Sequence, residues 1–440
     1  MDFDRGDFMP LLLICCFVLL GGVLGACTVH PAEEATGTTP SLVYEMTNGY
    51  WYRDGRFEEQ TMYAVDGVLR ANRPENVREV IDLAGGYVLP AFGDAHTHWP
   101  AVPERVSEHS LNFLPQGVFY LMNQGSPGRY RQAVRALVNG PESVDVAFAF
   151  GLVGSKQSHG MAVFQKLAKR SVYPGMTVED LDGDGYFIVE SAADIDAHWP
   201  TLMAAQPDFV KIMVEHSDDH HRRRDDPEFF GRSGLDPALV PPIIARAHSE
   251  GLRVSAHIET AVDFALVVDA GIDMVAHMPG YDLPSEDDLT RYRITPEDAA
   301  KAARQGVAVV TTTLLSQGFG RDDPERLSAM RKNHAANLHT LANAGVELII
   351  GSDRYGDSAV DEVMNLASLG VLDRAMLVSM LCSKTPQAIF PDRRIGTLED
   401  GAEASLVVLG GNPLEDLSHL REPTRVFKDG QPLEFPEDAT

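Results

Sequence analysis

Two histidines one residue apart, His96 and His98, end an apolar stretch in LPAFGDAHTHWP (89–100). Because side chains alternate along a β-strand, both imidazoles would point to the same face, together with Asp94. Two imidazoles in that arrangement suit the chelation of Zn²⁺ or a similar ion. By itself the pair is weak evidence, since ordinary histidines on a strand would look the same.

Three later residues could complete a metal site. His257 in VSAHIE, His277 in VAHMP and Asp353 in IIGSD each lie at or near the C-terminal end of another apolar stretch. Each has a structural alternative, as a hydrogen-bonded core histidine or as a loop cap. Their shared position at strand ends favours a joint role in metal binding.

Lys211 lies inside FVKIMV, a stretch that is otherwise almost wholly apolar. A lysine buried on such a strand is costly because its ammonium group loses water. We therefore expect this amine to be neutralised or covalently changed.

The elements that would position these residues are eight apolar stretches separated by amphipathic ones. The candidate strands are YVLPAFGDAH, GVFYLMNQG, DVAFAFGLVG, DFVKIMVEH, RVSAHIE, DMVAHMP, VAVVTTT and VELIIGSD. Continuous apolar runs are typical of parallel strands buried on both faces, and stretches such as 237–251 and 333–345 are helical in pattern. The sequence predicts an α/β fold with a (β/α)8 TIM barrel over 87–392. Short strand-like segments at 42–86 and 393–440 would form a small β-sandwich domain from both ends of the mature chain.

With these residues and flanks, the chain resembles the amidohydrolase superfamily, close to its imidazolonepropionase, prolidase and dipeptidase branch. GGYVLPAFGDAHTH is similar to the family's entry into strand one, and IGTLEDGAEASLVVLGGNPLEDL to its return into the β-domain. The resemblance covers about residues 43–431. Ala91 and Ser405 depart from the family's usual Gly and Asp, and neither is a ligand position.

The resemblance implies a two-metal centre. The residues that match the family's ligands are His96, His98, Lys211, His257, His277 and Asp353. The histidines of strand one and the aspartate would hold one divalent ion, and the two later histidines a second. Lys211 would carry a CO₂-derived carbamate that bridges both ions. Zinc is the expected metal, with manganese, iron or cobalt as alternatives, and Asp353 would be general base and then general acid.

Substrate contacts are indicated less specifically. His159, in a Gly-containing loop after the third strand, matches a substrate-facing histidine of prolidase-like relatives, and Trp99 would wall the pocket. A solvated loop histidine and barrel packing explain these two residues equally well. Long insertions at 154–208 and 216–236 would meet the substrate, because loops after barrel strands usually do. The arginines at 222–224 could hold a substrate carboxylate or belong to a solvated lid.

The reaction implied is hydrolysis of an amide-type C–N bond in a small molecule. A dipeptide of the Xaa-Pro kind, an N-acyl amino acid and a cyclic amide are the expected substrate classes. A lactone or phosphoester substrate at the same metal centre is an alternative, as is a lipoprotein that binds its ligand without turnover. The formal net charge of −27 excludes nucleic acid as an expected partner, and an oligomer is compatible with the sequence.

The first residues have the pattern of a secretion signal. An apolar run at 11–26 is shorter than a membrane span and ends at LGAC, which resembles a bacterial lipobox. We therefore expect a signal peptide over 1–26 and lipidation of Cys27. The acidic residues before the run are unusual for a signal, and a start at Met9 would remove them. An uncleaved membrane anchor is the alternative.

Residues 27–41 are expected to form a flexible tether, since the stretch is polar and rich in Thr and Pro. The body of the protein would then be lipid-anchored to a membrane and face the periplasm or the cell surface. Apart from the cysteines of the leader, Cys382 is the single one in the chain, so no intrachain disulfide framework is expected.

Overall fold

The computed structural model describes residues 42–283, 288–354 and 358–436. All of them belong to one compact unit. The expected signal peptide, the lipidated Cys27 and the tether at 27–41 lie outside the described residues. Within the described part, no helix combines the length and the apolar character that crossing a membrane requires.

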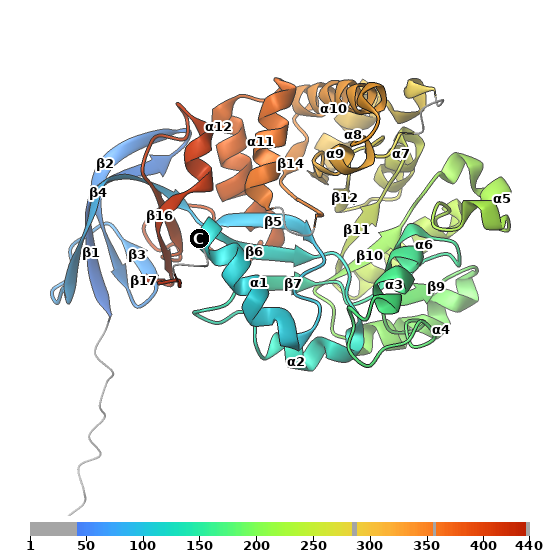
Figure 1. Cartoon of the computed structure of the whole chain (residues 1–440), viewed down its shortest axis with the longest axis horizontal. Helices are drawn as coiled ribbons and strands as arrows, with labels where there is room; N and C mark the ends of the chain where they lie inside the picture. Colours follow the sequence, from blue (N-terminus) through green and yellow to red (C-terminus); the bar gives the residue numbers. More distant parts are fainter. Residues whose placement is uncertain (1–41, 284–287, 355–357, 437–440) are drawn as a thin grey trace, which may run out of the picture. The chain divides into compact units, whose positions relative to one another are not determined.

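Parallel strands form the frame of the molecule (Figure 1). A three-stranded sheet has the order β5-β6-β7, and a seven-stranded sheet has the order β14-β13-β12-β11-β10-β8-β9. The bounds of the first sheet are Phe92–Thr97 (β5), Val118–Asn123 (β6) and Asp145–Phe148 (β7). Those of the second are Leu152–Gly154 (β8), Tyr186–Ile188 (β9), Phe209–Met213 (β10), Arg253–His257 (β11), Met274–Ala276 (β12), Ala308–Val310 (β13) and Glu347–Ile349 (β14). Each of the eight apolar stretches contains at least one of these strands.

Two features of the strands were not expected. The stretch 145–154 is divided into β7 and β8, because Phe150 and Gly151 have left-handed backbone angles of φ 48° and 98°. A side chain at Gly151 would meet the ring of Phe187 at 2.7 Å, so glycine is required at this bend. β9 arises inside the insertion 154–208 and extends the sheet beyond β8.

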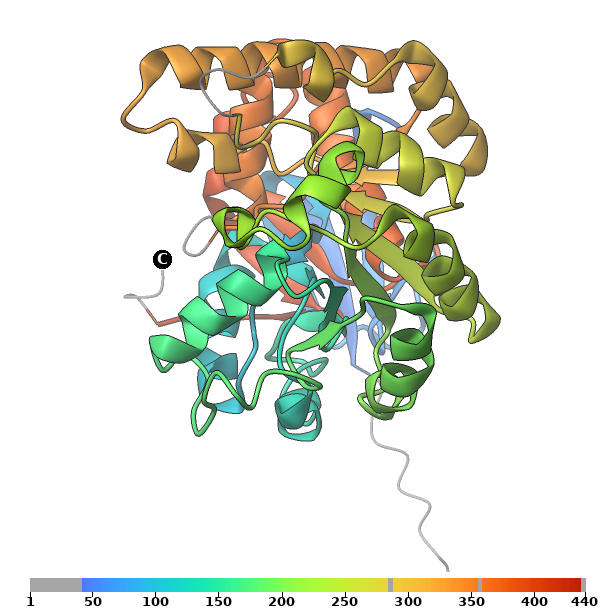
Figure 2. The ribbon, with the colours of Figure 1, turned by 90° about the vertical axis from the view of Figure 1, so that its right-hand side faces the viewer.

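Backbone hydrogen bonds join the two parallel sheets. Ala95 N, in β5, donates to Ile350 O just after β14, at 2.8 Å, and Asp208 N just before β10 donates to Phe148 O of β7, also at 2.8 Å. Helices surround the strands (Figure 2). This is a TIM-barrel-like α/β arrangement, which confirms the α/β part of the predicted fold class, while closure into a (β/α)8 barrel and a β-sandwich stay predictions.

The helices include both amphipathic stretches noted in the sequence, as α6 and as part of α10. Their bounds are Val106–Phe113 (α1), Arg131–Arg135 (α2), His159–Lys169 (α3), Ala192–Ala204 (α4), His220–Arg223 (α5), Val240–Ser249 (α6), Ala261–Asp269 (α7), Pro296–Gln305 (α8), Leu315–Phe319 (α9), Pro324–Ala344 (α10), Ala359–Leu369 (α11), Arg374–Ser379 (α12) and Thr385–Ile389 (α13). A π-helical turn, Met380–Lys384, joins the last two.

A β-rich part is built from both ends of the described chain, as predicted. Its strands are Val43–Arg53 (β1), Arg56–Val65 (β2), Val68–Arg70 (β3), Glu79–Pro90 (β4), Leu406–Leu409 (β15), Pro423–Lys428 (β16) and Gln431–Pro432 (β17). They form one seven-stranded sheet in the order β17-β16-β15-β4-β1-β2-β3, in which β4 pairs with β15. Because β4 continues to Pro90, a single residue separates it from β5. The predicted domain boundaries stay predictions.

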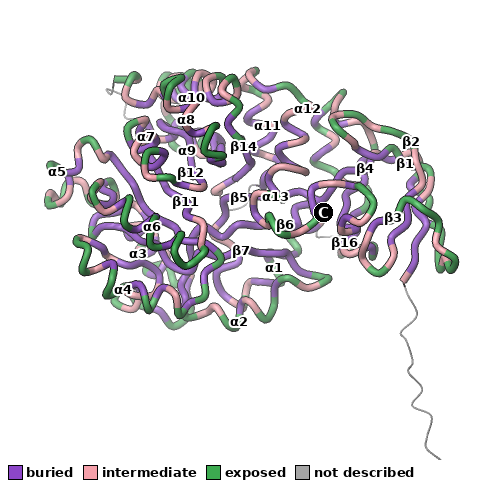
Figure 3. The backbone as a smooth tube through the Cα atoms, turned by 180° about the vertical axis from the view of Figure 1, so that it is seen from behind, coloured by how far each residue is buried: buried purple, intermediate pink, exposed green. Residues whose placement is uncertain are grey.

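The strands of the parallel sheets are the most deeply buried elements (Figure 3). Every residue of β5, β6, β7 and β10 is buried, including the polar Asp94, His96 and Lys211. Burying those groups is unfavourable unless they are paired, bonded or neutral. The polar residues at the strand ends are therefore the part of the core that needs a functional explanation.

Candidate metal centre

His96, His98 and Asp353 form a cluster at the end of β5. One ligand-type atom from each of the three lies within 4.8 Å of the others. The Nε2 atoms of His96 and His98 are each 3.5 Å from a different oxygen of Asp353. Asp353 follows β14 with a left-handed φ of 48°, and its backbone N–H donates to His96 O at 2.8 Å. Two strand ends far apart in sequence therefore supply one candidate site.

His257 and His277 lie next to this cluster. His277 Nε2 is 3.7 Å from Asp353 Oδ2, and the His277 ring centroid is 4.6 Å from those of both His96 and His257. His257 ends β11, and His277 follows β12. The four imidazoles therefore come from three different strand ends, and three of them lie within 3.7 Å of one carboxylate.

Hydrogen bonds orient two of the rings. His98 Nδ1 is 3.0 Å from Gly125 O, so this nitrogen carries the proton and donates it. His277 Nδ1 lies 2.8 Å from the Thr312 hydroxyl. In both rings Nε2 faces Asp353 and is available as a ligand atom.

Burial lowers the pKa of His96 and His277 well below the usual value, and the pKa of His257 falls to about 3. The positive charge of Lys211 is a smaller cause of the lowered pKa in all three rings. These three imidazoles are therefore neutral, which is the state that binds a metal.

Lys211 is buried in β10, with 3% of its surface exposed. Its Nζ has no hydrogen-bond partner among the described residues. Burial lowers its pKa to about 7, and the nearby Asp353 opposes that shift. The amine is therefore neutral in a large part of the molecules at neutral pH, and it lacks the partners that a structural lysine would have.

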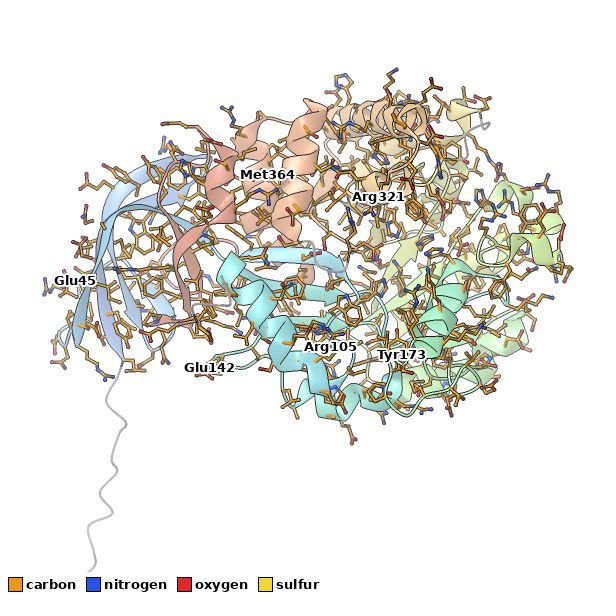
Figure 4. The ribbon with its side chains drawn as sticks, in the orientation of Figure 1. Glu45, Arg105, Glu142, Tyr173, Arg321 and Met364 are labelled. Atoms are coloured by element: carbon orange, nitrogen blue, oxygen red, sulfur yellow. The ribbon has the colours of Figure 1, made fainter. Side chains whose placement is uncertain are left out.

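One cavity of about 260 Å³ collects the expected residues. Its lining includes His96, His98, Lys211, His257, His277 and Asp353. The lining also has an apolar part from α3 and neighbouring strands, which includes Leu152, Phe164 and Met213. Tyr173 (labelled in Figure 4) packs against the Phe164 ring from outside, with centroids 5.7 Å apart.

The two expected substrate contacts also line this cavity. His159 is the first residue of α3, and its ring stacks on His257 with centroids 5.3 Å apart and planes at 14°. Trp99 packs against His109 at 5.0 Å, and the guanidinium group of Arg105 (labelled in Figure 4) lies 5.8 Å above its ring. Both residues have access to a ligand, while their roles in binding one stay predictions.

Asp94 has a supporting role that strand alternation alone did not reveal. It is fully buried, and its carboxylate accepts the N–H groups of His96 and Ser352 at 3.0 Å and the Ser352 hydroxyl at 2.6 Å. Burial raises its pKa to about 6. Asp94 therefore connects β5 to the segment that carries Asp353. Its own carboxylate is used in these three hydrogen bonds.

Tyr281 and Glu259 were missed by sequence reasoning. The Tyr281 hydroxyl donates to Glu259 and lies 3.3 Å from His257 Nε2, and Glu259 Oε1 is 3.2 Å from the same nitrogen. Burial raises the pKa of Glu259 to about 7. The available signal was spacing: Glu259 is two residues after His257 and Tyr281 four after His277, each in the loop that follows a ligand.

A TIM-barrel-like frame with polar residues gathered at its strand ends is an arrangement found in many enzymes, whose active sites lie at those ends. No protein-family model matches the sequence. Ochratoxinase from Aspergillus niger is 23% identical over 220 residues, which is 49% of this chain and 44% of that protein. The match thus spans less than half the length of this curated relative.

Solved structures share the fold over nearly the whole chain. A. niger ochratoxinase has a TM-score of 0.71 at 16% identity, covering 91% of this chain and 99% of its own. A Xaa-Pro dipeptidase with bound methionine has 0.70 at 16%, covering 89% and 100%. An amidohydrolase has 0.66 at 22%, covering 90% and 100%. These hydrolases confirm the predicted resemblance to the amidohydrolase superfamily at the level of the fold.

Proposed function

We propose that this chain is a metal-dependent amidohydrolase that cleaves an amide-type C–N bond of a small molecule. The observation that carries the proposal is the buried amine of Lys211, which has no hydrogen-bond partner in the described part of the chain and lies beside four imidazoles and Asp353 in one cavity. Among the described residues, the hydrogen bonds of these side chains do not account for so many buried nitrogen and carboxylate groups in one cavity.

The donor atoms fit two divalent cations. His96, His98 and Asp353 would hold one, and His257 and His277 a second. Imidazole and carboxylate donors favour zinc, with manganese, iron or cobalt as alternatives. When bound, the cations would supply an acidified water molecule and a polarised substrate carbonyl.

Lys211 would join the two groups of ligands as a carbamate. Its neutral amine would attack CO₂, one C=O π bond would break as the N–C bond forms, and the proton lost from nitrogen would pass to water, which leaves a single negative charge shared by two carbamate oxygens. This change removes the buried ammonium and turns a partnerless donor into a ligand. The chemistry of the site suits a carbamate, because the amine of Lys211 is buried, uncharged in a large part of the molecules and part of the cavity lining.

Asp353 would carry out the proton transfers. Its oxygens face the Nε2 atoms of His96, His98 and His277 at 3.5–3.7 Å, and it lines the cavity. It would take the proton of the attacking water and deliver it to the departing nitrogen. His159 and Trp99 would contact the substrate, with the apolar part of the lining receiving its hydrophobic portion.

Dipeptides of the Xaa-Pro kind, N-acyl amino acids and cyclic amides are the proposed substrate classes. The names of the structural neighbours, an ochratoxinase and a Xaa-Pro dipeptidase among them, support hydrolysis of such bonds. Lipid anchoring at Cys27 and a periplasmic or cell-surface location stay predictions from the leader sequence, as does the oligomeric state.

The test combines metal analysis with a substrate panel. Purified full-length protein grown with Zn²⁺ or Mn²⁺ should contain about two equivalents of divalent metal and hydrolyse members of a panel of dipeptides, N-acyl amino acids and lactones. Chelation should abolish the activity and added metal restore it. Less than about half an equivalent of metal, or full activity in Asp353→Asn, would refute the proposal. Turnover of lactones alone would favour the alternative reaction.

A further inference from the structure

A separate cavity of about 440 Å³ lies where α12 runs beside the turn between β1 and β2 (Figure 1). Its lining comes from the end of β1, the π-helical turn, α13 and the loop at 396–399. Among the described residues, it shares no lining side chain with the cavity of the candidate metal centre. A volume of this order accommodates a small molecule, so this cavity can be considered as a second ligand site.

The charged side chains of this cavity are not paired with one another. They are Arg53, Asp54 and Glu399, and none of them forms an ion pair within the described part of the chain. Arg53 Nε is buried and has no hydrogen-bond partner among the described residues. A buried donor without a partner is unfavourable, because it has lost water and gained nothing in exchange. The cavity therefore offers one cation and two anions that a ligand could neutralise.

The β1–β2 turn fixes the position of Arg53 and Asp54. Asp54 and Gly55 have left-handed φ angles of 47° and 81°, as a tight Asp-Gly hairpin turn requires. Across this turn, Arg53 is the register partner of Arg56. Because the turn is short and its register is set, the cation and one anion are held next to each other at one side of the cavity.

The π-helical turn and the loop that carries Glu399 form another side. Ser379 precedes the turn, Ser383 lies within it, and both line the cavity. The loop passes so close that a side chain at Gly396 would meet Ser383 O at 2.6 Å, so glycine is required there. π-helical turns occur frequently at functional sites. Here the turn brings two hydroxyl groups to the same cavity as the unpaired charges.

We propose that this cavity binds a free amino acid as its zwitterion, with the carboxylate held by Arg53 and the ammonium group held by Glu399. A guanidinium group is suited to a carboxylate, and the serine hydroxyls would complete the hydrogen bonds of the ligand. A phosphate ion would pair with Arg53 and would then face two carboxylates. A neutral polyol would leave all three charges uncompensated. The site is distinct from the metal centre and does not depend on the proposed hydrolysis.

The test begins with the standard amino acids, screened by thermal shift on the metal-loaded full-length protein. Calorimetry then compares the amino acid that stabilises most with its two analogues that lack the amine or the carboxylate. The amino acid should bind about ten-fold or more tightly than either analogue, and Arg53→Gln should remove that advantage. Arg56→Gln is the matched control, because Arg56 lies across the same hairpin, pairs with Glu58 and is absent from the lining. It should leave binding unchanged.

Two further variants keep the proposal falsifiable. Glu399→Gln changes an exposed side chain and should weaken binding of the amino acid, while the analogue without the amine should bind as before. Asp353→Asn, at the candidate metal centre, should retain the binding that Arg53→Gln removes. Loss of binding in Asp353→Asn with retention in Arg53→Gln would place the amino acid at the metal centre and overturn the proposal. Absence of binding for every amino acid, or equal binding of both analogues, would also overturn it.

Discussion

At the residue scale, the centre depends on side chains whose buried state is at odds with their usual chemistry. Lys211 is the clearest case, because its amine is buried and has no hydrogen-bond partner among the residues that the structure describes, while Asp94 is buried with three hydrogen bonds. The hydrogen bonds of Asp94 indicate a residue that supports the site, whereas the lack of such bonds at Lys211 among the described residues indicates one that would react in it. The exposed fraction alone does not distinguish Asp94 from Lys211, since both are buried.

Lys211→Ala should lower metal affinity by about 100-fold or more, since it removes the proposed bridging ligand. Added propionate should restore part of the metal content and activity, because its two oxygens can replace those of the carbamate. Metal content and hydrolysis with and without propionate give the readout. Lys156→Ala, at an exposed lysine paired with Asp225, is the control and should retain both. Full metal content and activity in Lys211→Ala would show that the bridging role is wrong.

His334 provides a pH-dependent prediction away from the site. It is buried in α10, and burial lowers its pKa from 6.5 to about 3. The folded state thus binds fewer protons than the unfolded state, so this group's stabilising contribution is full above pH 6.5 and is lost as the pH falls towards 3. At pH 5 the loss is about 2 kcal/mol.

Urea unfolding at pH 7 and pH 5 tests this. Between the two values, the free energy of unfolding should fall by about 2 kcal/mol more in the wild type than in His334→Gln, which cannot titrate in this range. An equal decrease in both proteins would contradict the assignment of this proton to His334.

At the scale of elements, helix α11 contacts the strand-end loop beside the centre. Glu362 of α11 accepts hydrogen bonds from Thr313 N and Thr313 Oγ1 at 2.8 Å and from Leu314 N at 2.7 Å. Just before these two residues, Thr312 has a left-handed φ of 41° and places its hydroxyl 2.8 Å from His277 Nδ1. The fully buried Glu362 therefore holds the loop that orients a metal-facing imidazole.

Glu362→Gln would replace an acceptor oxygen by a donor in front of N–H groups. We expect the loop to shift and metal affinity to fall about 10–100-fold, the usual effect of removing a residue that orients a ligand. Competition with a chelator measures the affinity directly. Glu347→Gln, at an exposed position of β14, is the matched control. Unchanged affinity in Glu362→Gln would show that the loop is held by its other contacts.

The elements also show which parts of the fold could be predicted. Strands such as β10 and β11 were recognisable because parallel strands covered on both faces are continuous apolar runs. The split at Gly151 and the added β9 were not, since both depend on how the insertion 154–208 packs. Periodicity contains no information about such a packing choice.

At the scale of the whole molecule, a buried ion cluster ties the β-rich sheet to the parallel strands. Lys428 of β16 is 2% exposed, and its Nζ contacts Asp145 Oδ1 of β7 at 2.6 Å and donates to Gly140 O at 2.7 Å. Asp145 Oδ2 also pairs with Arg393 at 2.8 Å. The end of the described chain is thereby fastened to a strand of the frame.

Lys428→Met should lower the free energy of unfolding by about 3–5 kcal/mol, because it leaves the buried Asp145 with one of its cationic partners missing. Denaturant unfolding measures the change. Lys156→Met removes an exposed pair with a 2.8 Å contact and should cost no more than about 1 kcal/mol. A similar small loss in Lys428→Met would mean that Arg393 alone compensates Asp145.

The sequence by itself determined the identity of the candidate ligands and their place at strand ends. Strand alternation and buried apolar runs are local properties, so the shared face of His96 and His98 and the unusual burial of Lys211 could be expected from a few neighbouring residues, whereas the complete ligand set was implied by the family resemblance. Only the tertiary structure decided what surrounds them. Tyr281 and Glu259 acquire their positions through loops that meet in space although distant in sequence. Such contacts depend on packing between elements, which no local pattern encodes.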